Sequence, residues 1–244
     1  MKTRLTALTI AVAVVLPLAA EAAKYTEVEV ANGGTVSGKV TFSGDDPAPN
    51  VYTISKDNDV CGTGTREIDY VRVNGDALND VVVYLDKVKE GKPFPAELSK
   101  TEINQENCEF KPFLQVMKNG TDLDAINSDP VLHNIHTYEI MGRAKKTVFN
   151  VSQPKPGTVT KAVKLKRGDA MKVECDAHDF MHGFVFVAKS PYSVQVADDG
   201  SYTIDNVPAG KYKIVAWHGT LKEQKGEVEV TADGTATADF AFKE

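Results

Sequence analysis

A long series of short segments rich in Val, Ile, Thr, Phe and Tyr runs through most of this chain and constrains its fold more than any other feature. Gly, Asp, Asn and Pro separate the segments, as at 32–34, 43–46, 167–169 and 198–200. Such residues favour strands, and many short strands are typical of β-sandwiches and barrels. One helical turn is expected within 95–104. Strands are expected at 35–42, 69–73, 81–88, 113–117, 133–140, 160–165, 170–175, 183–188, 201–204, 211–217, 226–230 and 235–242.

The first 22 residues have the pattern of a secretory signal peptide. Two basic residues precede an apolar stretch over 5–20, and Ala20 and Ala22 form a small-residue cleavage site. The stretch is short for a bilayer span and contains Thr and Pro, so a membrane anchor is the weaker alternative. We therefore expect a secreted or periplasmic protein that begins near Ala23 and does not span a membrane.

The strongest chemical signal is the string ECDAHDFMHG at 174–183. It places Cys175, His178 and Met181 at C-x-x-H-x-x-M spacing, and His133 lies upstream in a separate strand-like segment. A thiolate, two imidazoles and a thioether are the ligand set of a type 1 copper site. The soft sulfur donors favour Cu(I), whereas imidazole suits both oxidation states. The sequence therefore predicts one copper ion bound by these four residues.

The predicted strands explain how these residues meet. We expect Cys175 to end one strand and Met181 to begin the next, while the loop between them turns His178 back to the same metal. His133 comes from a different strand. Two alternatives stay open: a zinc site that also uses His182, and a buried structural thiol at position 175.

The string 174–183 resembles the copper loop of the amicyanin and plastocyanin branch of the cupredoxins, and DPVLHNIH at 129–136 resembles the strand that carries the first ligand in that family. The resemblance covers about residues 107–189. It implies that the four residues bind copper and that Asn134 braces the ligand loops through hydrogen bonds. The chain departs from the pattern at Asp179, where the amicyanin loop usually has Pro.

Three cysteines make an odd count, and an exported protein meets an oxidising compartment. With Cys175 assigned to the metal, Cys61 and Cys108 are the expected disulfide. The alternative is that Cys175 pairs with one of the other two in the metal-free protein. The formal net charge of −6 argues against nucleic acid as a partner.

The predicted fold class is all-β: a cupredoxin-like Greek-key β-sandwich with an additional small β-sandwich module. We place a copper domain with an N-terminal β extension at 23–189 and the module at 190–244. The string at 198–218 resembles prealbumin-like and carboxypeptidase-regulatory-like modules. The segment 33–44 resembles the opening strand of such modules, so a sheet shared by the two sections is the alternative.

The first functional hypothesis is a carrier that shuttles single electrons between periplasmic redox proteins, with a cytochrome or a dehydrogenase as partner. His178, flanked by Phe180, is the expected exposed exit for electrons. His136 is expected on the surface or in outer contacts, and His218 in a structural role. The alternatives are a copper chaperone or store and a structural β module that carries a metal site. A copper enzyme is disfavoured because the chain has no His-x-His pair.

Overall fold

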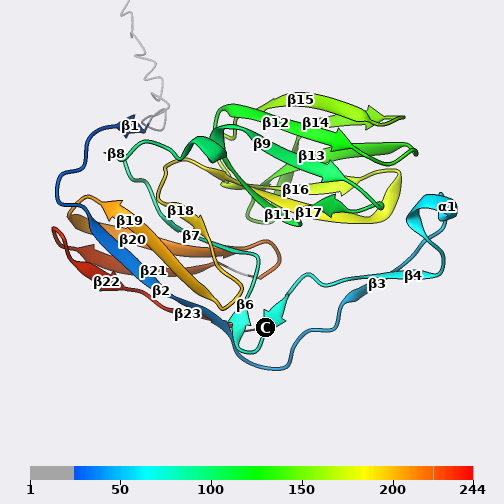
Figure 1. The fold of residues 1–244 in the computed structure, drawn as a ribbon. Helices are drawn as coiled ribbons and strands as arrows, with labels where there is room; N and C mark the ends of the chain where they lie inside the picture. The colour runs from blue at the N-terminus through cyan, green and yellow to red at the C-terminus, as the bar shows by residue number, and fades with distance from the viewer. Residues whose placement is uncertain (1–24, 222, 244) are drawn as a thin grey trace, which may run out of the picture.

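The computed structural model describes residues 25–221 and 223–243, and this part of the chain is almost entirely β (Figure 1). The predicted all-β class is confirmed. Most strands belong to four sheets that pack as two β-sandwiches, each with its own hydrophobic core. Within the described ranges, no helix is long and apolar enough to cross a bilayer. The signal peptide predicted at 1–22 lies outside the described residues.

The first sandwich contains the predicted copper ligands. One of its sheets has the strand order β10-β9-β12-β15 and the other has the order β11-β17-β16-β13-β14. Buried side chains from both sheets, such as Leu123 and Val173, meet in the core between them. The strands are β9 (Thr101–Gln105), β10 (Phe110–Lys111), β11 (Leu114–Lys118), β12 (Thr121–Asn127), β13 (His133–Met141), β14 (Ala144–Gln153), β15 (Gly157–Val163), β16 (Ala170–Cys175) and β17 (His178–Ala188).

The second sandwich combines strands from the two ends of the chain. One sheet has the order β19-β2-β6-β5, with β22 and β23 also paired to β2, and the other has the order β18-β7-β20-β21. Its strands are β2 (Gly34–Phe42), β5 (Val73–Asn74), β6 (Ala77–Leu78), β7 (Val81–Leu85), β18 (Ser193–Gln195), β19 (Ser201–Val207), β20 (Gly210–His218), β21 (Gln224–Val230), β22 (Thr235–Thr237) and β23 (Phe240–Phe242).

This pairing corrects the predicted domain boundary between residues 189 and 190. β2 pairs with β19, β22 and β23, and β7 pairs with both β18 and β20. Residues 190–244 therefore do not form the second sandwich alone, because both of its sheets also take strands from the N-terminal part of the chain. The alternative of a shared sheet describes the molecule.

A third core joins the two sandwiches and explains two nearly continuous apolar segments, 81–85 and 184–188. Side chains alternate between the two faces of a strand. In β17, Phe184 and Phe186 point into the joining core, whereas Val185 points into the first sandwich. In β7, Val82 points into the joining core and its neighbours point into the second sandwich. Each strand is buried on both faces, which requires an apolar run rather than an alternating pattern.

A separate arm, residues 50–68, leaves the second sandwich and reaches one end of the first (Figure 1). It consists of β3 (Asn50–Thr53), the short helix α1 (Asn58–Cys61) and β4 (Thr65–Ile68), with β3 and β4 paired antiparallel. The remaining elements are β1 (Thr26–Glu27), which pairs with β8 (Glu90–Gly91), and the 3₁₀ helix η1 (Ala96–Ser99). The helical turn expected within 95–104 is confirmed by η1, whereas α1 was not predicted.

Candidate metal centre

Three of the four predicted ligands meet at one end of the five-stranded sheet of the first sandwich, on its three central strands. Cys175 is the last residue of β16, and His178 is the first residue of β17. The two residues pair across a tight hairpin, with a register shift between Glu174 and Cys175. His133 begins β13, which lies beside β16. A hairpin and the start of its neighbouring strand therefore bring three donors to one place.

The donor atoms are close enough to share one ion. The Nδ1 atoms of His133 and His178 are 3.1 Å apart, and the Cys175 sulfur lies 3.7 Å from Nδ1 of His178. All three donor atoms lie within 4.8 Å of one another, and all three residues are buried. Met181 is 1% exposed and belongs to the same hydrophobic cluster as Cys175. It is therefore placed in the same core, as a candidate for the weaker fourth donor.

The other nitrogen of each imidazole contacts a carboxylate. His133 Nε2 lies 2.8 Å from Asp129 Oδ2, and His178 Nε2 lies 2.8 Å from Asp57 Oδ2. When Nε2–H donates to the carboxylate on each ring, both Nδ1 atoms carry lone pairs. Two lone pairs that face each other at this separation repel, and a bound cation satisfies both. The donor set and its outer contacts therefore fit a metal ion.

Asn134 holds the hairpin against β13, as the resemblance implied. Its backbone N–H points at the Cys175 sulfur at 3.4 Å. Its side-chain amide donates to Asp176 Oδ2 at 3.0 Å, and its amide oxygen accepts the backbone N–H of Asp176. Burial raises the pKa of the Cys175 thiol, while the N–H groups of Asn134 and of the hairpin oppose that rise. The same N–H groups would stabilise a thiolate bound to a metal.

Cys61 and Cys108 form a disulfide, and Cys175 is the free cysteine of the described chain. The structure therefore has the pairing that the cysteine count predicted. The disulfide also lies beside the site, because Asp129 accepts the backbone N–H of Cys108 at 2.8 Å and contacts His133 through the same oxygen. Burial opposes ionisation of Asp129, but the N–H of Cys108 and the contact with His133 outweigh it and lower its pKa.

The expectation that His178 forms an exposed edge of the site is wrong. His178 is 1% exposed, and its Nε2 atom faces Asp57 of the arm. Burial also lowers the pKa of His178. No local sequence signal could have revealed this contact, because residue 57 lies 121 positions upstream. Asp129 was within reach of sequence reasoning, because it lies four residues before His133.

His136 and His218 take the roles expected of them, and His182 lies outside the candidate site. His136 lies on the surface side of β13, with Nδ1 3.0 Å from an oxygen of Asp176. His182 packs against the rings of Tyr52 and Tyr70, outside the cluster of donor atoms. His218 lies in the second sandwich, where its Nδ1 accepts two backbone N–H groups, and burial lowers its pKa to about 4. A zinc site that uses His182 is therefore not assembled.

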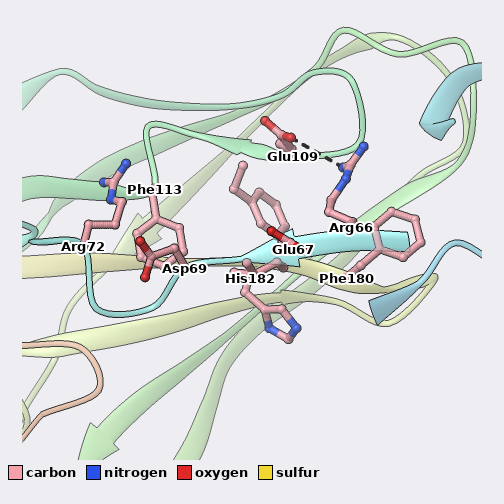
Figure 2. Close-up of a pocket in the computed structure, with 10 residues that line it drawn as sticks. Arg66, Glu67, Asp69, Arg72, Glu109, Phe113, Phe180 and His182 are labelled. Carbon is pink, nitrogen blue, oxygen red and sulfur yellow. Dashed lines mark ion pairs between the residues drawn. The ribbon is translucent and has the colours of Figure 1, made fainter. Parts of the chain in front are cut away.

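A cavity of about 220 Å³ lies next to the candidate site without including its donor atoms. Phe180 separates the two, with its ring centre 5.3 Å from that of His178. Figure 2 shows Arg66 and Phe180 together at one end of the cavity and Arg72 and Phe113 at the other. The guanidinium of Arg66 lies 5.2 Å from the centre of the Phe180 ring.

Comparison with known proteins adds one family match. The profile described as polysaccharide lyase family 4, domain II, matches residues 183–238. This is not the carboxypeptidase-regulatory module that the tail of the sequence resembles, so that part of the sequence interpretation is corrected. The matched stretch begins within β17 and ends after β22. No curated protein matches the chain.

Several solved structures resemble about a third of the chain. A purple cupredoxin from Nitrosopumilus maritimus is 18% identical, with a TM-score of 0.31, over 36% of this chain and 100% of its own. Amicyanin from Paracoccus versutus is 19% identical, with a TM-score of 0.30, over 38% and 84%. Auracyanin A from Chloroflexus aurantiacus is 12% identical, with a TM-score of 0.30, over 36% and 98%. Likeness at this level carries no functional assignment, which rests on the side chains described above.

Proposed function

We propose that this chain binds one type 1 copper ion through His133, Cys175, His178 and Met181 and carries single electrons between redox proteins. The observation that carries the proposal is the buried cluster in which two imidazole Nδ1 atoms and a cysteine sulfur converge. When bound, copper supplies a one-electron couple between Cu(I) and Cu(II). The protein supplies a fixed set of soft and borderline donors that both oxidation states accept.

The surroundings of the site support a carrier rather than an enzyme. His133, Cys175 and His178 are each no more than 3% exposed. Catalytic metal sites keep an open coordination position for substrate, and this enclosure provides no such opening. Enclosure also hinders the ligand exchange by which a chaperone passes on its metal, so it disfavours the chaperone and storage alternative.

We place this function in a secretory or periplasmic compartment, with a redox protein such as a cytochrome or a dehydrogenase as partner. The disulfide Cys61–Cys108 supports an oxidising environment, because such bonds persist there and are rare in the cytosol. The signal peptide predicted at 1–22 agrees with it. N-terminal sequencing of the exported protein tests this placement: a mature start near Ala23 agrees with export, and an intact Met1 contradicts it.

Stepwise electrochemical reduction and reoxidation of the copper-loaded protein, followed by visible absorption, tests the carrier role. We expect a blue band that disappears and returns reversibly with one electron for each copper. A carrier must keep its metal in both states. Release of copper during the cycle would contradict the proposal and favour a chaperone or store.

Met181→Leu should leave one copper bound and raise the reduction potential. The axial thioether affects the reduction potential of the copper more than its affinity. Removing this donor destabilises bound Cu(II) more than bound Cu(I), which raises the potential. Leu conserves the volume of Met, so the free energy of unfolding should fall by less than about 1.5 kcal/mol. The matched control is Met171→Leu, which alters another fully buried methionine of the same cluster. Loss of copper from Met181→Leu, or an equal shift of potential in both variants, would contradict the assigned role.

A further inference from the structure

The arm formed by residues 50–68 is fixed against the end of the first sandwich at several points. Ile54 and Cys61 are buried in the core of that sandwich, and the disulfide joins Cys61 to Cys108. Arg66 donates to the backbone carbonyls of Cys61 and Asn107 at 2.9 and 3.1 Å. It also donates to the carbonyl of Cys108. The tip of the arm is therefore held in place by covalent, polar and apolar contacts.

Asp57 stands at the start of α1, but its side chain does not cap that helix. Its backbone is left-handed, with φ of 51°, and its carboxylate makes no capping hydrogen bond. The carboxylate instead contacts Nε2 of His178 at 2.8 Å. The Asp57 side chain is 37% exposed and the His178 ring is fully buried. Asp57 therefore lies between a candidate metal ligand and solvent.

The two carboxylates at the site are connected through the disulfide. The backbone carbonyl of Asp57 accepts the N–H of Cys61, and the carboxylate of Asp129 accepts the N–H of Cys108, both at 2.8 Å. The bond between Cys61 and Cys108 thus ties the group that holds His178 to the group that holds His133. Both imidazoles are oriented from outside by one cross-linked unit.

We propose that Asp57 is a positioning residue of the metal site and that the arm closes this site to external ligands, an inference that rests on the proposed copper function. By accepting Nε2–H, the carboxylate holds His178 in the tautomer whose Nδ1 binds the metal. Such partners fix the ring and raise its basicity, and their removal typically costs about 10- to 100-fold in metal affinity. Negative charge and a more basic imidazole favour Cu(II) over Cu(I), so their loss raises the reduction potential.

Two substitutions separate the charge of Asp57 from its hydrogen bond. Asn tolerates the left-handed backbone, and its amide oxygen can still accept Nε2–H, so Asp57→Asn removes only the charge. Gly also suits this backbone, and Asp57→Gly removes the acceptor and uncovers the ring. The matched control is Asp59→Asn, which makes the same change of charge at an exposed residue of α1.

The experiment compares the copper-loaded wild type with these three variants, after circular dichroism has established that each is folded. The measurements are Cu(II) affinity against a competing chelator, the reduction potential, and the change of the visible spectrum on addition of azide. We expect Asp59→Asn to behave as the wild type and Asp57→Gly to lose about 10- to 100-fold in Cu(II) affinity. With Cu(I) affinity unchanged, each tenfold loss raises the potential by about 59 mV. Azide should change the visible spectrum of Asp57→Gly alone. Asp57→Asn should raise the reduction potential by less than Asp57→Gly does.

Asp57→Gly behaving as Asp59→Asn in affinity, potential and azide response would overturn the inference while leaving the copper function intact. A wild type that forms no coloured copper complex would remove the proposed function and this inference together, so the two failures are distinguishable. If Asp57→Gly does not fold, Asp57→Asn tests the charge of Asp57, and a reduction potential equal to that of Asp59→Asn would contradict the proposed effect of Asp57 on the metal.

Discussion

Replacing Cys175 by Ser should abolish the blue absorption of the copper-loaded protein. The intense visible band of a type 1 site requires a thiolate bound to Cu(II), and Cys175 is the free cysteine of the described chain. Serine is nearly the same size, so the buried hairpin should keep its shape, and circular dichroism checks this. The measurement is the visible spectrum after addition of one equivalent of Cu(II).

The matched control is His136→Asn, which lies on the face of β13 that points away from the core between the two sheets. That variant should stay blue, because its side chain lies outside the cluster of donor atoms. Retention of the band in Cys175→Ser would contradict the site as described. Loss of the band in both variants would show that the effect is not specific to the thiolate.

Removing the disulfide should lower the free energy of unfolding by about 4 kcal/mol on the chain-entropy account. Cys61 and Cys108 are separated by 47 positions, so their cross-link strongly restricts the unfolded chain. Cys61→Ala/Cys108→Ala is best measured in a Cys175→Ser background without metal, where neither thiol exchange nor copper binding contributes. Equilibrium unfolding in urea gives the difference from Cys175→Ser alone.

A loss below about 1 kcal/mol would contradict a disulfide that restricts the unfolded chain in this way. A single-cysteine control, Cys61→Ala in the same background, should lose a similar amount, because one partner is sufficient to break the bond. If Cys61→Ala unfolded with the same free energy as Cys175→Ser alone, the cross-link would not be the source of the stability lost in the double variant.

The cluster of candidate donor atoms could be predicted from the sequence because most of it is local. Cys175, His178 and Met181 lie within seven residues, and a hairpin between two strand-like segments brings the first two together whatever the rest of the chain does. The disulfide followed from the cysteine count. A strand at 183–188 was predicted, but the burial of both its faces depends on a joining core that only the assembled sandwiches create.

What could not be predicted depends on contacts between distant segments. The four-residue helix α1 has no apolar periodicity that would mark it, and its position is fixed by the disulfide and by Arg66. The cover that Asp57 places over His178 depends on that position, so exposure of this histidine was predicted wrongly. The boundary of the second sandwich was misplaced because its strands come from both ends of the chain. The resemblance of 33–44 to an opening strand supported only the alternative of a shared sheet, because strand order alone does not specify which distant strands pair.

Titration of the metal-free protein with Cu(II), followed by visible absorption, tests the central claim most directly. We predict an intense blue band that grows linearly and saturates at one copper for each chain, because the proposed site is a single buried set of two imidazoles, a thiolate and a thioether. A parallel titration with Zn(II) should compete for the same site and remain colourless. A colourless or pale one-to-one copper complex, or the absence of copper binding, would contradict the account.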